Sequence, residues 1–168
     1  LIYSHFSLDI EKSKVIALIA PSGRGKTTLL DFIAGLFSKN DDTTDFSGNV
    51  QFAQNCGYRP LISYVFQEDR LVPQLSILQN VMLPLENLME KVEAKKRALV
   101  YLEKTGLQQK INSFPKNLSG GEKQRASLAR AFAYPSSILL LDEPFQSQDI
   151  RTKSNLIELF LAMQSDEK

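Results

Sequence analysis

VIALIAPSGRGKTTLL, residues 15–30, joins a continuous apolar run to a loop that contains two glycines and a lysine. The run VIALIA (residues 15–20) is short and has no polar residue, which is typical of a strand buried in a parallel sheet. The residues that follow the loop, TTLLDFIAGLF, have the spacing of a helix that ends near Ser38. The stretch therefore predicts a strand, a tight loop and a helix in immediate succession.

The loop APSGRGKTT, residues 20–28 and called the phosphate loop below, has the spacing of a P-loop, with Ala20 where glycine is more usual. Gly23 and Gly25 allow backbone N–H groups to curl around phosphate oxygens. Lys26 would reach the outer phosphates, and the Thr27 hydroxyl would bind Mg²⁺. A chance match in a chain of this length has a frequency on the order of one in a hundred, so we interpret the loop as a phosphate site.

The rest of the chain alternates strand-like and helical patterns. Strands are expected at residues 6–10, 15–20, 50–54, 62–66 and 138–141. Apolar residues recur at helical spacing from residue 85 to residue 102, and a final amphipathic helix is expected at residues 150–163. Alternating strands and helices with buried strands predict the α/β class with a mainly parallel sheet. The helix-rich residues 75–118 look like a separate lobe.

A second apolar run ends in two carboxylates, in ILLLDEP at residues 138–144. A strand end beside a phosphate loop is where a carboxylate that orients Mg²⁺ belongs, which would be Asp142. Glu143 would then polarise the attacking water as a general base. The alternative is an ordinary strand followed by a polar turn before Pro144.

The segment LSGGEKQRASLARA, residues 118–131, places two glycines before a strongly helical pattern. Ser119 is a good N-cap, and Glu122 three residues later completes the pattern of a capping box. One interpretation is a well-capped helix that ends before Pro135. The other is that Gly120 and Gly121 let an anion approach the exposed N–H groups of the helix N-terminus.

Together these motifs resemble the ATP-binding cassette (ABC) ATPase family. The phosphate loop is similar to its Walker A loop, residues 138–144 to its Walker B strand, and LSGGEKQR to its signature motif. YVFQEDRLVP (residues 64–73) resembles the Q-loop, with Gln67, and FQSQD (residues 145–149) resembles the D-loop, which ends at Asp149. The motifs occur in family order and cover nearly the whole chain.

The resemblance implies a P-loop NTPase fold with a mainly parallel core sheet, an N-terminal antiparallel β part and a helical insert. One nucleotide-binding domain would span residues 1–168, with the P-loop core at residues 1–74 and 119–168 and the helical subdomain at residues 75–118. Two such domains pair head to tail in the family, and the signature helix of one faces the ATP of the other. Gln67 would contact Mg²⁺ or the lytic water.

The residues implied as sites fall into three groups. Catalytic roles are implied for Glu143 and Gln67. Nucleotide contacts are implied for Pro21, Ser22, Gly23, Arg24, Gly25, Lys26, Thr27, Thr28, Ser119, Gly120, Gly121 and Asp149. Mg²⁺ contacts are implied for Thr27, Gln67 and Asp142.

By the same resemblance the chain would energise a membrane importer from the cytoplasmic face of the plasma membrane. Its partners would be a second nucleotide-binding subunit, a transmembrane permease and, indirectly, a solute-binding protein. Residues 64–85 look most like importer ATPases for nitrate, taurine and aliphatic sulfonates. The alternatives are a binding-only or degenerate cassette and a soluble cassette ATPase outside transport. No histidine follows Glu143 where the family has its switch histidine, so a truncated chain with little turnover on its own is expected.

Composition agrees with a globular domain that does not bind nucleic acid. Of the 168 residues, 43% are hydrophobic and 23% are charged, which is ordinary for such domains. The net charge of +1 provides no bulk attraction to nucleic acid. The single cysteine, Cys56, cannot form an internal disulfide.

Overall fold

Parallel pairing of two short strands, β1 (Ile62–Val65) and β2 (Ile138–Leu141), organises residues 60–144. The structure, a computed structural model, describes residues 3–37, 48–52, 60–144, 153–154, 157–158 and 160–162. Its contacts divide the chain into two compact units, Leu1–Ala53 and Gln54–Lys168.

The strands expected at residues 62–66 and 138–141 are confirmed. Ile62 pairs with Ile138 and Val65 with Leu141, and the Asp142 amide donates to the Val65 carbonyl at 2.9 Å just beyond the pair. Because parallel strands end at the same edge of a sheet, the residues that follow β1 and β2 leave the pair at a common edge. The α/β class with a parallel sheet is therefore present in this unit.

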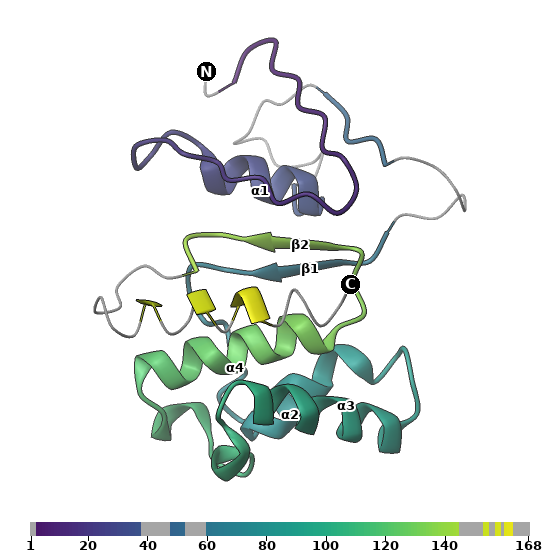
Figure 1. Ribbon diagram of the computed structural model, residues 1–168, viewed down its shortest axis with the longest axis vertical. Helices are drawn as coiled ribbons and strands as arrows, with labels where there is room; N and C mark the ends of the chain where they lie inside the picture. Colours follow the sequence, from purple (N-terminus) through teal and green to yellow (C-terminus); the bar gives the residue numbers. More distant parts are fainter. Residues whose placement is uncertain are drawn as a thin grey trace. The chain divides into compact units, whose positions relative to one another are not determined.

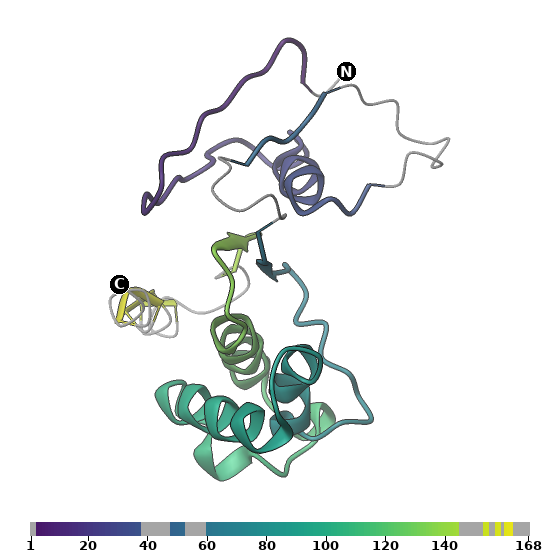
Figure 2. The same ribbon diagram turned by 90° about the vertical axis from the view of Figure 1, so that its right-hand side faces the viewer.

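Helix α4 (Gly120–Ala133) packs on strand β1, and helices α2 (Ile77–Met82) and α3 (Lys91–Lys104) pack on α4. Figures 1 and 2 show these three helices gathered on one side of the strands. Short 3₁₀ turns at Leu83–Leu85, Gln108–Lys110 and Pro115–Asn117 connect them. The largest fully buried apolar side chains of this core are Ile77, Leu85, Leu102, Leu107, Leu128, Val65 and Val81.

The helix expected from apolar spacing at residues 85–102 begins later than predicted, at Lys91. The reason is local. Pro84 has no N–H to donate to a helical bond, and the end of α2 tightens into the 3₁₀ turn Leu83–Leu85 around it. The chain then makes a turn before Glu90, the N-cap position of α3, which gives the helix no side-chain hydrogen bond. The apolar residues before residue 90 therefore belong to a different element from those after it.

Asn80 fastens the segment that precedes α2 to the helix itself. Its side chain is fully buried, and its Oδ1 accepts from the Val72 amide at 2.7 Å. Its Nδ2 donates to the carbonyls of Val72, Leu75 and Ser76, each at 3.1 Å. Ser76 also caps α2 in a capping box with Gln79. These bonds give the buried amide partners for both of its polar ends.

The Leu1–Ala53 unit contains helix α1 (Lys26–Ala34), which ends at Gly35 with a left-handed φ of 72°. The strands expected at residues 6–10 and 15–20 are wrong, because the described residues 3–37 contain no strand. Ile19 is 93% exposed there. An apolar run becomes a strand only where a neighbour completes its backbone ladder, and the described part of this unit contains no such neighbour. The N-terminal antiparallel part is therefore not formed among these residues.

Two further expectations lie partly outside the described residues. Of the strand expected at residues 50–54, residues 50–52 are described and are not in a strand. Of the final helix at residues 150–163, the described residues 153–154, 157–158 and 160–162 are helical. Within the described parts of the chain, no helix has the length and apolar character needed to cross a bilayer.

Helix α3 offers a matched test of the core. Leu102 is fully buried and Val92 is 83% exposed on the same helix. We expect Leu102→Ala to lower the free energy of unfolding by about 2–5 kcal/mol, because it removes buried contacts and leaves a cavity. Val92→Ala should stay within about 0.5 kcal/mol of the parent. Urea unfolding measures both, and equal losses in the two variants would contradict this description of the core.

Candidate functional site

The phosphate loop has the backbone that an anion cradle requires. Gly23 and Gly25 have φ angles of 75° and 83°, in the left-handed region that favours glycine. A Cβ added to Gly23 would meet no atom within 4 Å, so the space beside it is open. Gly25 is the N-cap of α1 and supplies no side-chain hydrogen bond to the first turn. A glycine N-cap thus offers the first turn of α1 no side-chain acceptor, and a helix N-terminus favours an anion.

Lys26 folds back over the loop in which it lies. Its Nζ donates to the carbonyls of Ala20 at 3.1 Å and Pro21 at 3.3 Å. Tyr3 donates its hydroxyl proton to the Gly25 carbonyl at 2.9 Å, a contact of which the sequence gives no sign. Neutral carbonyls bind an ammonium group less strongly than phosphate oxygens do. Lys26 can therefore exchange these bonds for bonds to a phosphate.

The structure places the other predicted phosphate-loop residues in the loop and in the first turn of α1. Thr27 and Thr28 are in the first turn of α1, next to Lys26. Ser22 and Arg24 flank Gly23 in the loop, and both are exposed.

Two carboxylates follow β2 at the common edge of the strand pair, and Gln67 follows β1 there. Asp142 is only 3% exposed, and its amide bonds to the last residue of β1. Glu143 has a φ of 45°, which is uncommon for a residue with a side chain and turns the backbone directly after β2. The edge therefore carries the carboxylates and the amide that the sequence predicts for it.

The fit to Mg²⁺ can be judged from the available donors. In the described parts of the chain, no three His, Cys, Asp or Glu side chains form a metal cluster. Mg²⁺ in nucleotide sites needs only one or two carboxylates, since phosphates and waters complete its shell. Asp142, a buried carboxylate of the Gln54–Lys168 unit, fits that requirement. In the Leu1–Ala53 unit, the Thr27 hydroxyl beside Lys26 is a suitable oxygen donor.

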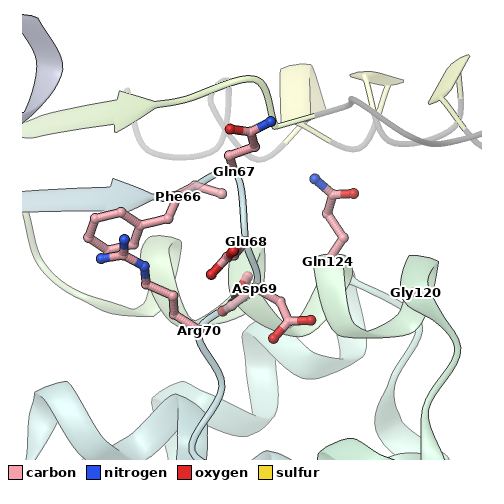
Figure 3. A pocket seen from close by; sticks show the side chains of 9 residues that line it. Phe66, Gln67, Glu68, Asp69, Arg70, Gly120 and Gln124 are labelled. Atoms are coloured by element: carbon pink, nitrogen blue, oxygen red, sulfur yellow. Dashed lines mark hydrogen bonds between the residues drawn. The ribbon is translucent and has the colours of Figure 1, made fainter. Parts of the chain in front are cut away.

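A cavity of about 480 Å³ in the Gln54–Lys168 unit brings together two residues that the sequence predicts as sites. Gln67 and Gly120 both line it, although they are far apart in the sequence (Figure 3). Its walls are formed by the segment after β1 and by one side of α4. The lining residues are Val65, Phe66, Gln67, Glu68, Asp69, Arg70, Gly120, Gln124 and Ser127.

The first turn of α4 confirms the predicted capping box. The Ser119 Oγ accepts from the Glu122 amide at 3.3 Å, and Glu122 Oε2 accepts from the Ser119 amide at 2.8 Å. The amides of Gly120 and Gly121 take no part in this box. A Cβ added to Gly120 would meet no atom within 4 Å. The helix is therefore well capped and still presents two glycine amides at its start.

Sequence reasoning missed a polar row on α4, which consists of Gln124, Ser127 and Arg130. Arg130 donates to the carbonyls of Arg70 at 2.9 Å and Asp69 at 3.0 Å. Ser127 Oγ donates to the Asp69 carbonyl, and Gln124 Nε2 donates to the Pro144 carbonyl. The spacing of three residues along a helix was the available signal, since such residues share a face.

Burial lowers the pKa of the Arg130 guanidinium, and the Asp69 carboxylate opposes this shift. The group still stays charged, as arginine does in proteins. Its bonds to the two carbonyls are therefore charge-assisted.

Of the predicted site residues, only Asp149 lies outside the described part of the chain.

The chain is similar to known proteins. The family model "ABC transporter" matches residues 3–146. The chain is 33% identical to the lipoprotein-releasing system ATP-binding protein LolD 1 of Rhodopirellula baltica, over 96% of the chain and 73% of that protein. It is 35% identical to the thiamine import ATP-binding protein ThiQ of Aliivibrio fischeri, over 97% of the chain and 70% of that protein.

A solved structure is also similar. It is the dimeric post-hydrolysis state of the ATP-binding cassette MJ0796 bound to ADP and Pi, with a TM-score of 0.73 and 31% sequence identity. The similarity covers 95% of the chain and 73% of that structure.

The Ser119 amide, which donates to the Glu122 carboxylate, lowers the pKa of that carboxylate below its ordinary value of 4.5. A group whose pKa is lowered by folding stabilises the fold above the unfolded pKa and loses this effect as pH falls through the folded pKa. We therefore expect the unfolding free energy to fall more steeply below pH 4.5 in the parent than in Glu122→Gln, which keeps a neutral acceptor. Urea unfolding between about pH 6 and pH 3 tests this; parallel curves would contradict it.

Proposed function

The chain belongs to the ABC transporter family and is an ABC ATPase domain that hydrolyses ATP, and we propose that its phosphate loop binds the triphosphate while Glu143 is the general base. The observation that carries the proposal is the form of the phosphate loop. The loop has two glycines with left-handed φ angles, open space at Gly23 and a helix start without a side-chain cap. Together these features let backbone N–H groups approach a phosphate. In this proposal Lys26 is the main cationic contact, and residues 21–28 supply the rest.

The roles at the strand edge are proposed from their chemistry. Asp142, Gln67 and Thr27 would hold Mg²⁺, which when bound neutralises charge on the phosphates. Glu143 would accept a proton from the attacking water, and Gln67 would orient that water or the metal. Support comes from the parallel register, which brings the ends of β1 and β2 to one edge, and from the burial of Asp142.

We propose that the working form is a head-to-tail pair of nucleotide-binding subunits. Ser119, Gly120, Gly121 and Asp149 would then face the ATP that the second subunit holds. The glycine amides outside the capping box support this role for α4, because the helix dipole favours an anion there. The dimeric form of the similar MJ0796 cassette supports the pairing. Residues 75–118 are the proposed helical subdomain within the single domain of residues 1–168.

The finer biological role stays a proposal. We propose that the pair couples ATP hydrolysis to a permease at the inner face of the plasma membrane, with a solute-binding protein as an indirect partner. The similar proteins carry names that refer to lipoprotein release and to thiamine import. The solute is therefore left open, and an importer of nitrate, taurine or sulfonates stays a prediction from residues 64–85.

The proposed role of Lys26 in nucleotide binding can be tested by substitution. Lys26→Ala should weaken ATP binding about ten- to hundredfold, because it removes a charge-assisted bond to phosphate. Lys14→Ala is the control, since Lys14 is an exposed lysine in the same unit and outside the loop. Calorimetric titration with ATP and Mg²⁺ measures both. An unchanged affinity in Lys26→Ala would overturn the assignment of the phosphate loop.

The proposed role of Glu143 can be tested separately from nucleotide binding. Glu143→Gln should keep ATP affinity and lower the steady-state hydrolysis rate at least about a hundredfold, because an amide cannot accept the proton. It should also favour an ATP-bound dimer in light scattering, since unhydrolysed nucleotide stays between the subunits. Glu93→Gln, at an exposed position of α3, is the control. Hydrolysis at the parental rate in Glu143→Gln would show that another group is the base.

A further inference from the structure

Residues 66–70, called the glutamine loop below, are held at their far end by helix α4. The guanidinium of Arg130 donates to the Arg70 carbonyl at 2.9 Å and to the Asp69 carbonyl at 3.0 Å. Ser127 adds a hydrogen bond from its hydroxyl to the same Asp69 carbonyl. At the near end the loop continues directly from β1, which is paired with β2. Gln67 thus lies between two anchored points.

Arg70 connects the anchored backbone to the residue beside Gln67. Its φ of 43° is in the left-handed region, which a residue with a side chain adopts only when its surroundings hold it there. Its guanidinium lies over the Phe66 ring, 3.9 Å from the centroid. The Tyr64 ring is also stacked on the Phe66 ring, at a centroid distance of 4.0 Å. Figure 3 shows Arg70 against Phe66, with Gln67 extending from the next position.

The helix that supplies these anchors also begins at the glycine pair. Arg130 and Ser127 lie in the same helix as Gly120, and the Ser119 capping box fixes the start of that helix. A helix of this length transmits a displacement of its first turn to its later turns, because its backbone bonds hold it straight. The bonds to Asp69 and Arg70 therefore connect the glutamine loop to the helix that begins at the glycine pair.

We propose that Arg130 is a positioning residue, which holds the glutamine loop on α4 so that Gln67 and the first turn at Gly120 move as one body. The proposal rests on the function proposed above for Gln67 and for the glycine pair. Under that function Gln67 orients Mg²⁺ or the attacking water at the nucleotide of its own subunit, and Gly120 faces the nucleotide that the second subunit holds. Arg130 would therefore couple the two nucleotide sites through one chain.

The first experiment measures the loop directly, by hydrogen exchange of the amides of residues 66–72. Arg130→Met removes both donors and keeps a long side chain, and it should speed exchange there by about tenfold or more. Ser127→Ala should have a smaller effect in the same segment. Arg97→Met is the matched control, because Arg97 also donates to a backbone carbonyl of α4, at Ala133, but outside this loop. It should leave residues 66–72 at the parental rate.

The second experiment asks whether Arg130 acts through Gln67. Arg130→Met should lower kcat by about ten- to hundredfold while ATP affinity without Mg²⁺ stays at the parental value. Arg130→Lys should recover part of the loss, since an ammonium group can still donate to a carbonyl but without the planar fork. In a Gln67→Ala background, Arg130→Met should cause little further loss, because the two changes remove the same function.

The outcomes separate this proposal from the one on which it rests. Unchanged exchange in residues 66–72 of Arg130→Met, or equal acceleration in Arg97→Met, would overturn the positioning role of Arg130. The positioning role would also be overturned if the loss of kcat in the double variant equalled the combined losses of Arg130→Met and Gln67→Ala measured separately. If instead exchange rises as expected and Gln67→Ala keeps the parental kcat, the hold of Arg130 on the loop stands and the function proposed for Gln67 is wrong. Should Arg130→Met not fold, Arg130→Lys and Ser127→Ala decide by the same exchange measurement.

Discussion

Close packing against helix α4 is the constraint on which the rest of residues 60–144 depends. The buried side of this helix is mostly alanine, at positions 126, 129, 131 and 133, so other elements can approach its backbone. Ser63 of β1 reaches the Ala131 carbonyl at 2.9 Å, and Arg97 of α3 reaches the carbonyl of Ala133. Larger side chains here would separate strand and helix, and such overpacking is costly in a dense core. The placement of β1, and through its register that of β2, follows from the size of these alanines.

A second set of α4 side chains bonds to backbone carbonyls of other segments. Gln124, Ser127 and Arg130 each donate to a carbonyl of a segment that follows a strand. Carbonyls that leave the end of a sheet need donors, and a buried one without a partner would be costly. One helix thus contributes apolar contact to hold the strands and polar contact to hold what comes after them.

The sequence predicted the parts of this fold that depend on neighbours in the chain. Strands β1 and β2 follow from short apolar runs, and the start of α4 follows from Ser119 and Glu122, whose mutual bonds are local. Residues 6–10 and 15–20 show the limit, because a strand needs a distant partner that no local pattern supplies. The late start of α3 has a different cause, since apolar spacing continues through Pro84 whereas backbone hydrogen bonding does not. For the site, motif residues were found by type, but Arg130 was missed because its acceptors lie in a distant segment.

Helices α1 to α4 begin in different ways, and α3, like α1, has no side-chain cap; its N-cap residue is Glu90. Ser76 and Ser119 close α2 and α4 with capping boxes, whereas α1 begins at Gly25 without a side-chain cap. The ordering of α1 is therefore linked to the concentration of any anion that binds its first turn. A ligand present at a hundred times its Kd, and bound only by the ordered form, adds about 2.7 kcal/mol to the stability of that form. A nucleotide bound at the phosphate loop would thus be a folding partner of this helix as well as a substrate.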